Sequence, residues 1–431
     1  MMKHTNSIFS IALASLACIS LAFAQVDSES EPVADQPGRA AQLTLDDLRT
    51  FTDVFNQARK NYVEEVDDKT LLDAAIRGML QELDPHSSYL PAPELEELND
   101  AAAGRYSGIG IEVKDREDKI VVNAIINGSP ADQAGINPGD VITSINGNPV
   151  EGRPASEAID ELLGQPDSDV VLRVIPPDGK ERELTVTRKY IKVPTLSFEL
   201  LDGSIGYFKM SQFHRESAID LEKAIASVAA SGVNLTALII DLRGNGGGVL
   251  RQAVAIADGF LDEGIIVSTR GRNSSMQLEF TATPGQWLPG IPLMILVDHS
   301  SASASEVMAG ALQDYGRAVI VGERTFGKGS VQSVLPLKTG AGIKLTTARY
   351  YTPSGHSIQA QGIEPDVAIE WTTEPADGDD SGRESDLERH LGYEPETETP
   401  EAAKIDIALE DFPLEEMLQA LRTAGIIPEQ G

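Results

Sequence analysis

Cysteine is almost absent from this sequence of 431 residues. The single cysteine, Cys18, lies in an apolar stretch near the amino terminus that we expect to be removed on export. The mature chain therefore has no disulfide and no cysteine nucleophile. Groups of His, Cys, Asp and Glu with the spacing of metal ligands are missing as well, so we expect neither a metal nor another cofactor.

Positive charge is also scarce. The sequence has 35 Lys and Arg against 67 Asp and Glu, which gives a formal net charge of -32 and a pI of about 4.5. This charge disfavours nucleic acid and anionic membrane surfaces as partners. Much of it lies in one tract near the carboxyl terminus, where its simplest effect is solubility. With 41% hydrophobic residues the chain can bury sizeable cores, and its length predicts two to four domains.

Two segments match nucleotide-binding motifs only in part. Gly322 to Lys328 reads GxxxxGK, but Gly329 follows where a phosphate-binding loop needs Ser or Thr to hold magnesium. The run Gly244 to Gly248 is followed by Val249, where a dinucleotide fingerprint needs its last glycine. We interpret the second run as a loop whose backbone approaches a substrate closely.

The amino terminus has the pattern of an export signal. Lys3 precedes an apolar stretch, and Ala22-Phe23-Ala24 is a small-x-small cleavage site. We therefore assign residues 1–24 to a signal peptide and residues 25–42, which are polar with prolines, to a linker. An uncleaved anchor is the alternative, because the apolar stretch is nearly long enough to span a bilayer. A lipoprotein signal at Cys18 is a weaker alternative, since Leu16 is misplaced for lipidation.

Helical periods mark both flanks of the chain. Residues 43–103 are predicted to be a helical region, with apolar residues at helical spacing from Phe51 to Ala58. Residues 373–403, rich in Glu, Asp, Pro and Thr, are predicted to be an acidic linker. Residues 404–431 are predicted to hold a helix whose apolar face packs on the body or forms a dimer.

Residues 104–190 have the pattern of a small β-domain. Glycines and alternating apolar residues run from Tyr106 to Val113, and Asn146-Gly147 is a hairpin signal between strands. Residues 191–372 instead alternate strands with helices. The run Leu238 to Leu242 is continuously apolar, as in parallel sheets. The fold class that follows is α/β, or α+β over several domains.

The stretch from residue 291 to residue 332 combines a strand, small residues, a helix, a strand and a glycine-flanked lysine. It predicts a serine at a helix N-terminus, Ser303, and a lysine on the next loop, Lys328. A serine hydroxyl needs a neighbouring base to become nucleophilic, and lysine serves as one when burial or positive charge lowers its pKa. Glycines on both sides of Lys328 would let its loop lie against the serine turn. An ordinary helix N-cap is the alternative reading of the serines.

The segments SASASE, LQDYGRA and GERTFGKGSVQ resemble the carboxy-terminal processing peptidases, the tail-specific serine proteases with a Ser/Lys dyad. The resemblance implies Ser303 as nucleophile, Lys328 as general base and Gln332 as the residue that orients the lysine. Asp314, in the LQD segment, has been given a further role in some members. Ser301 and Ser305 are the alternative nucleophiles. The resemblance also implies a crotonase-like or ClpP-like core.

Two binding elements follow from the same kind of resemblance. The family uses a glycine N–H from DLR.N.GG for the oxyanion hole, so one donor is Gly246 or Gly247, a choice the sequence leaves open, and the second is the N–H of Ala304. GSPADQAGINPGDVITSINGNPV resembles a PDZ domain, which binds a peptide as an added strand and holds its carboxylate on backbone N–H groups. The matching carboxylate loop consists of Gly108, Ile109, Gly110 and Ile111.

The resemblances together imply an exported, periplasmic serine endopeptidase. Its expected partners are proteins or peptides with accessible C-termini, a helical-repeat adaptor lipoprotein of the kind that some relatives use, and further copies of itself. Two other classes compete: a tail-binding scaffold without activity, and acyl-CoA chemistry on a crotonase fold. Both members of the Ser303–Lys328 pair are present and accompany a peptide-binding domain, so a peptidase is favoured.

Overall fold

The computed structural model describes residues 43–116, 119–369, 382–393, 405–406 and 422. The predicted signal peptide and the linker of residues 25–42 lie outside these residues, as does most of the predicted C-terminal helix. The chain divides into two compact units, Met1–Asp67 and Asp68–Gly431, which we describe separately. In the described ranges, no helix combines the length and the hydropathy needed to cross a membrane.

The first unit contains helix α1, Leu45–Asn61. Thr44 caps it: the Thr44 N–H donates to Asp47 Oδ2 (2.8 Å), and the Asp47 N–H donates to Thr44 Oγ1 (3.2 Å). This reciprocal capping box satisfies backbone donors at the helix start. The sequence prediction of a helix beginning here is confirmed.

The second unit begins with helix α2 (Asp68–Gln81), strand β1 (Ser88–Leu90) and helix α3 (Ala92–Ala102). Helices α2 and α3 lie within the region of residues 43–103 that the sequence predicts to be helical. Strand β1 pairs antiparallel with β18 (Gly342–Tyr351) and so fastens the end of the helical region to a sheet of the main body.

A separate six-stranded sheet follows, with its own buried core. The strand order is β3-β4-β5-β7-β8, with β6 paired to β5, while β2 and β9 form a ribbon of their own. Asn146 and Gly147 have φ of 51° and 84° and make the predicted hairpin turn between β5 and β6. The elements are β2 (Arg105–Gly108), β3 (Ile111–Arg116), β4 (Lys119–Ile125), α4 (Pro130–Gln133), β5 (Val141–Ile145), β6 (Asn148–Pro149), α5 (Ala155–Leu162), β7 (Asp169–Ile175), β8 (Arg182–Thr187) and β9 (Lys189–Lys192).

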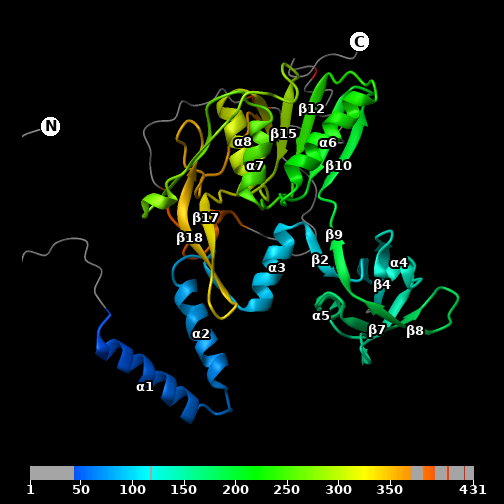
Figure 1. The fold of residues 1–431 in the computed structure, drawn as a ribbon, viewed down its shortest axis with the longest axis vertical. Helices are drawn as coiled ribbons and strands as arrows, with labels where there is room; N and C mark the ends of the chain where they lie inside the picture. Colours follow the sequence, from blue (N-terminus) through cyan, green and yellow to red (C-terminus); the bar gives the residue numbers. More distant parts are fainter. Residues whose placement is uncertain (1–42, 117–118, 370–381, 394–404, 407–421, 423–431) are drawn as a thin grey trace, which may run out of the picture. The chain divides into compact units, whose positions relative to one another are not determined.

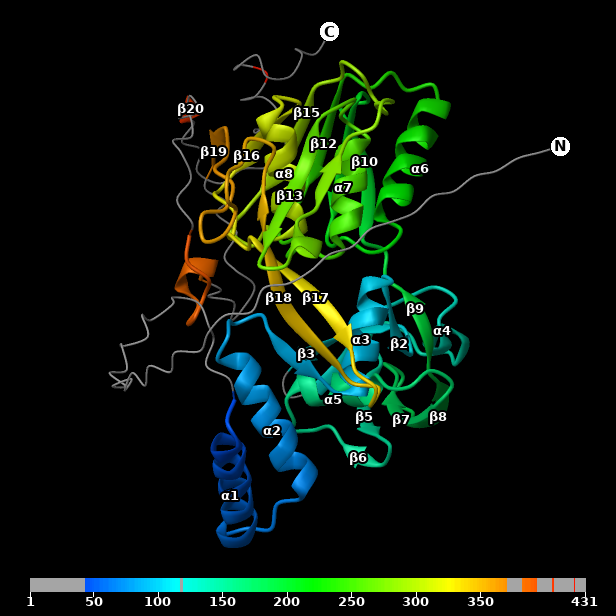
Figure 2. The same ribbon diagram turned by 60° about the vertical axis from the view of Figure 1, so that its left-hand side comes forward.

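The main body is built on a seven-stranded sheet of order β10-β11-β12-β15-β16-β19-β20, in which every neighbouring pair after β10-β11 is parallel. Figure 1 shows α6, α7 and α8 beside this sheet, and Figure 2 shows β12, β15, β16 and β19 in order. The elements are β10 (Leu196–Leu201), β11 (Ile205–Met210), α6 (Ser217–Ala230), β12 (Ala237–Asp241), α7 (Leu250–Asp258), β15 (Leu293–Val297), α8 (Ala304–Asp314), β16 (Ala318–Gly322), β19 (Val367–Ala368) and β20 (Ile405–Asp406).

Alternation along the strands divides the core between the two faces of this sheet. Leu238 and Ile240 of β12 pack in one buried cluster with α6, α7 and α8, whereas Ala237 and Ile239 belong to another. Successive side chains of a strand point to opposite faces, so the continuous apolar run of β12 means that both faces are covered. The predicted α/β architecture with a parallel sheet is confirmed.

A second sheet of the main body has the order β1-β18-β13-β14, and β17 pairs with β18. In Figure 1 the hairpin of β17 and β18 extends away from the seven-stranded sheet. The elements are β13 (Ile265–Gly271), the 3-10 turn η1 (Ser274–Met276), β14 (Glu279–Thr281) and β17 (Ser330–Pro336).

Residues 382–393 differ from the sequence prediction of a loose acidic linker. They form a defined segment that contains the 3-10 turn η2, Glu384–Asp386, and the side chain of Glu384 is fully buried at 0% exposure. The composition is polar, but its hydrogen bonds to the main body replace the apolar burial that the sequence lacks. We call residues 382–393 the strap.

Candidate active site

Three loops meet at one edge of the seven-stranded sheet. Strands β12, β15 and β16 are parallel neighbours, and the carboxyl ends of such strands lie at the same edge. Strand β12 leads into the glycine loop (residues 242–249), β15 into the serine turn (298–303), and β16 into the lysine loop (323–329). The topology therefore brings together the three motifs that the sequence singles out.

Ser303 occupies a strained position between β15 and α8. Its φ of 54° and ψ of -109° lie outside the regions that residues with a Cβ normally adopt. A sharp strand-to-helix turn of this kind presents the serine hydroxyl at the end of a helix where N–H groups are unpaired. This geometry is unlike that of an ordinary N-cap, which is extended.

The alternative nucleophiles have structural partners instead. Ser301 and Ser305 are both 0% exposed, whereas Ser303 is partly exposed. Ser301 Oγ donates to Leu242 O (2.8 Å), and Ser305 Oγ donates to Asn245 O (2.9 Å). Both hydroxyls therefore hold the glycine loop to the serine turn, and Ser303 is the accessible serine of the three.

Glu306, which the sequence analysis missed, joins the serine turn to the lysine loop. It is 0% exposed, and its Oε2 accepts hydrogen bonds from the N–H groups of Ser303 (2.7 Å) and Lys328 (2.9 Å). Its Oε1 accepts from the Gly327 N–H (2.6 Å) and the Thr325 hydroxyl (2.6 Å). Burial raises the pKa of Glu306 to about 7, while these four donors favour its charged form. The S-x-x-E spacing of a capping box was the sequence signal for it.

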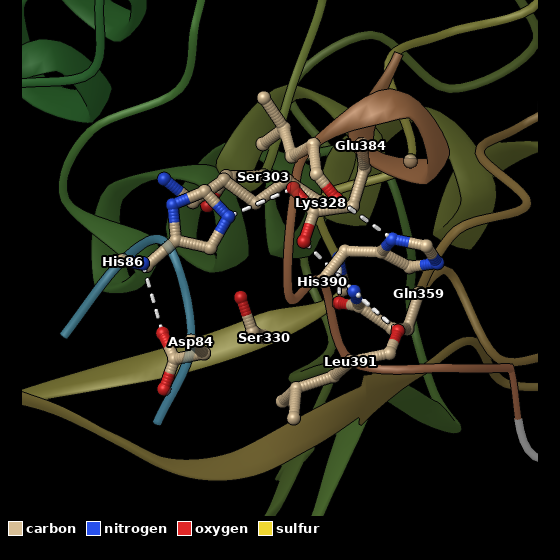
Figure 3. Close-up of polar contacts among 12 residues, drawn as sticks. Asp84, His86, Ser303, Lys328, Ser330, Gln359, Glu384, His390 and Leu391 are labelled. Carbon is tan, nitrogen blue, oxygen red and sulfur yellow. Dashed lines mark hydrogen bonds and ion pairs between the residues drawn. The ribbon is translucent and has the colours of Figure 1, made fainter. Parts of the chain in front are cut away.

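Lys328 lies in surroundings that favour its neutral form. Burial lowers the pKa of Lys328, and the nearby Lys344 ammonium lowers it further, while Glu384, Glu306 and Asp84 act in the opposite direction. Figure 3 shows Lys328 beside Ser303 and Glu384. A lysine with a lowered pKa is the kind of base that a serine hydroxyl requires.

The glycines beside Lys328 pack closely against a neighbouring turn of the main body. A Cβ at Gly329 would lie 2.2 Å from the backbone nitrogen of Gln359, and a Cβ at Gly327 would lie 3.2 Å from that of Gly362. They therefore press against the turn of residues 358–362. The lysine loop also lies against the serine turn, as expected, and the contact is made by Phe326, whose N–H donates to Ser301 O (3.1 Å).

The glycine that touches the serine turn is Gly247. Its φ is +103°, and a Cβ at this position would lie 2.7 Å from Ala302 O and 3.0 Å from Ala304 N, which is too close for any residue but glycine. Its own N–H donates to Asn245 Oδ1 (2.9 Å). Among the described residues the N–H groups of Gly246 and Ala304 have no hydrogen-bond partner. This pattern favours the N–H groups of Gly246 and Ala304 as the two donors to an oxyanion. Gly247 instead allows the glycine loop to pack closely against the serine turn.

Gln332 lies on β17, next to a bulge in its pairing with β18. Its Nε2 donates to Ser330 Oγ (2.9 Å) and Thr346 Oγ1 (3.3 Å), and Thr346 Oγ1 donates in turn to Asp84 Oδ1 (3.0 Å). Gln332, the residue predicted to orient the lysine, thus belongs to a polar network with Ser330, Thr346 and Asp84.

Asp314 lies far from this network. It is exposed at the last residue of α8, and its Oδ2 accepts a hydrogen bond from the Ser354 N–H (2.8 Å). Ser303 precedes the first residue of the same helix, and a helix of that length places the two roughly 16 Å apart along its axis. The structure therefore does not bring Asp314 to Ser303 or Lys328.

The LDPHS segment contributes a buried support that the sequence analysis did not assign to the site. Asp84, 4% exposed, accepts from the N–H groups of His86 (2.9 Å) and Ser87 (2.9 Å), and His86 Nε2 lies 2.8 Å from Glu384 Oε2. Figure 3 shows His86 reaching toward the Lys328 side of the site. Asp84 thus caps this turn, and His86 joins the turn to the strap.

The predicted carboxylate loop lies between β2 and β3, the edge strand of the six-stranded sheet. Gly110 has φ of +81°, and a Cβ there would lie 2.4 Å from the Ser129 Cβ, so the loop needs glycine at this position. Ile109 is 2% exposed in the core of this domain, and Ile111 packs partly buried against that core. Gly108 ends β2, paired with Lys189.

The described residues contain no group of three or more His, Cys, Asp and Glu placed to hold a metal ion.

The chain matches three known families. Residues 204–369 match peptidase family S41, residues 121–176 a PDZ domain, and residues 13–93 the N-terminal domain of the activating protease CtpB.

Similar proteins carry the same descriptions. The chain is 40% identical over 332 residues to a carboxy-terminal-processing protease of Bartonella bacilliformis, covering 76% of each chain. It is 34% identical over 325 residues to a probable CtpA-like serine protease of Staphylococcus aureus, covering 75% of this chain and 65% of that protein. A solved photosystem II D1 C-terminal processing protease is 32% identical, with a TM-score of 0.45, covering 74% of this chain and 87% of that one.

Proposed function

Because this chain belongs to peptidase family S41, among carboxy-terminal-processing proteases that carry a PDZ domain, we propose that it is a serine endopeptidase with a Ser303–Lys328 dyad. The observation that carries the proposal is the double anchorage on Glu306, whose Oε2 holds the backbone N–H groups of both residues. One buried carboxylate thus fixes the nucleophile and the base relative to each other.

The reaction follows from these positions. Neutral Lys328 accepts the proton of the Ser303 hydroxyl as the oxygen attacks a peptide carbonyl carbon. The oxyanion accepts hydrogen bonds from the N–H groups of Ala304 and Gly246, at the positive end of α8. The tetrahedral intermediate collapses, the C–N bond breaks, and the amine leaves with the proton from Lys328. Water then attacks the acyl-enzyme, with Lys328 again as base, and releases Ser303.

Substrate capture belongs to the six-stranded domain in this proposal. Strand β3 is at the end of its sheet, so an extended C-terminal tail can pair along it, with the terminal carboxylate on the loop of residues 108–111. The partners are accordingly proteins with accessible C-termini.

We also propose that the protein is exported to the periplasm. A helical-repeat adaptor lipoprotein and further copies of this chain are the other partners that we propose.

The test is degradation of a loosely folded protein with an apolar C-terminal tail, compared with the same protein ending in two aspartates. Wild type, Ser303→Ala and Lys328→Ala are followed from mildly acidic to alkaline pH. The proposal expects cleavage by wild type only, faster with the apolar tail and increasing with pH as Lys328 loses its proton. Cleavage by either variant at the wild-type rate would show that the dyad is wrong. Tail binding without cleavage by wild type would favour a tail-binding protein.

A further inference from the structure

The strap lies outside residues 204–369, the part of the chain that matches peptidase family S41, yet it is fastened to the lysine loop. The Glu384 N–H donates to Phe326 O (3.1 Å). The Arg383 guanidinium donates to the carbonyl oxygens of Arg324 (3.0 Å) and Thr325 (3.1 Å). These contacts satisfy backbone acceptors of the loop just before Lys328.

The buried carboxylate of Glu384 also reaches the residue just after Lys328. Its Oε1 accepts from Gln359 Nε2 (2.8 Å), and Gln359 Oε1 accepts from the Gly329 N–H (3.1 Å). Its Oε2 lies 2.8 Å from His86 Nε2. Figure 3 shows Glu384 between these partners and Lys328. The loop is therefore held before Lys328 by the Glu384 backbone and the Arg383 side chain, and after Lys328 by the Glu384 carboxylate acting through Gln359.

We propose that Glu384 is a positioning residue for Lys328, which orders the lysine loop and places a buried negative charge near the lysine side chain. The inference rests on the proposed function, in which Lys328 is the general base. It assigns to the strap a part in the active site, although its sequence is that of an acidic linker.

The charge of Glu384 follows from its partners. Burial by itself would raise the pKa of Glu384, but the hydrogen bonds from His86 and Gln359 and the charge of Lys328 outweigh it, and the pKa is lowered. Glu384 is therefore an anion at neutral pH. The other charged groups that act on Lys328 come from three elements: Lys344 on β18, Glu306 on α8, and Asp84 beside β1.

The two effects of Glu384 on catalysis have opposite signs. Its hydrogen bonds order the loop, which favours the reaction, whereas its charge stabilises the protonated form of Lys328, which cannot act as base. Removing the charge while keeping the shape should therefore make the enzyme active at lower pH. A residue with a structural role alone would not move the pH profile in this way.

The experiment is the pH dependence of kcat/KM for Glu384→Gln with the apolar-tailed substrate. Glutamine keeps an acceptor for Gln359 but carries no charge. We expect the midpoint of the rise in rate to move to lower pH by roughly 0.5 to 1 unit, since a nearby carboxylate shifts a pKa by about this amount or more. An unchanged midpoint, or a shift to higher pH, would overturn the inference.

Three variants serve as controls. Glu388→Gln makes the same charge change at an exposed position of the strap and should leave the midpoint in place; an equal shift there would mean a general charge effect and would also overturn the inference. Glu384→Asp keeps the charge with a shorter reach, so it should lower the limiting rate without moving the midpoint. Lys328→Ala must be inactive; if it cleaves normally, the proposed function has failed, and not merely the role of Glu384.

Discussion

The serine turn and the lysine loop supply the two halves of the proposed dyad, and they are held in different ways. Ser303 is positioned by its own neighbourhood: a strained turn, the start of α8, and Glu306 three residues later. Lys328 is positioned from a distance, by Glu306 on α8, Gln359 beyond β18, and Glu384 on the strap.

The serine turn therefore mainly sets the geometry of attack, whereas the surroundings of the lysine loop also set the pKa of the base. A nucleophile needs a direction of attack, and local backbone strain can fix one. A lysine base needs a shifted pKa, which depends on burial and on charges that many elements contribute. Changes at the serine turn should therefore alter how fast the enzyme works, and changes around the lysine loop should also alter the pH at which it works.

Glu306→Ala should have the largest effect, because it breaks the anchor that both regions share. Four donors around a buried carboxylate lose their acceptor, so we expect kcat/KM to fall by about 10³-fold or more and the free energy of unfolding to fall by roughly 3–5 kcal/mol. Peptidase assays and denaturant unfolding measure the two. Glu364→Ala, an exposed carboxylate 3.8 Å from Arg324 of the lysine loop, is the matched control and should stay within about 0.5 kcal/mol. Similar losses in both variants would argue against the anchor.

Gly247→Ala should come next and should affect the serine turn alone. The new Cβ would lie 2.7 Å from Ala302 O, whereas a Cβ at Gly246 meets nothing within 4 Å. We expect kcat to fall about 10²-fold for Gly247→Ala and less than about threefold for Gly246→Ala, with the pH midpoint unchanged in both. Steady-state kinetics over pH distinguish the pair. A loss of equal size in Gly246→Ala would mean that the close contact of Gly247 is not what matters.

Lys344→Gln should have the smallest effect and should act on the lysine loop alone. The Lys344 ammonium lowers the pKa of Lys328, so its removal raises that pKa and moves the rise of kcat/KM to higher pH, by about half a unit. This shift is opposite in sign to the one expected for Glu384→Gln. Lys338→Gln, exposed on the turn of the same hairpin, should leave the profile in place. Equal profiles for the two lysine variants would remove Lys344 from the account.

The sequence predicted the serine turn better than the lysine loop, for a physical reason. The strand, the small residues and the start of α8 are contiguous, so their periods and the dyad residues could be recognised together. Glu306 was within reach of the same reasoning, because a serine followed three residues later by glutamate is a helix-start pattern. The strain at Ser303 and the burial of Ser301 and Ser305 could be learned only from the packed turn.

The surroundings of Lys328 could not be predicted because they come from segments that are distant in the sequence. Composition marked the strap as a linker, since its few apolar residues give no sign that hydrogen bonds would bury Glu384. The close approach of Gly327 and Gly329 to the turn of residues 358–362 could not be predicted for the same reason: glycine indicates that something lies close, but does not say what. The position of Asp314 follows simply from helix length, which the motif alone does not convey.

Lys328 combines a pKa lowered by burial with nearby charges that raise or lower it further. The most direct test is an NMR titration of the Lys328 side chain in Ser303→Ala protein with labelled lysines, assigned by the resonance lost in Lys328→Arg. We expect a midpoint below the ordinary lysine value of about 10.4 and a further decrease when Glu384→Gln is added. A midpoint at the ordinary value, unmoved by that second change, would contradict this expectation.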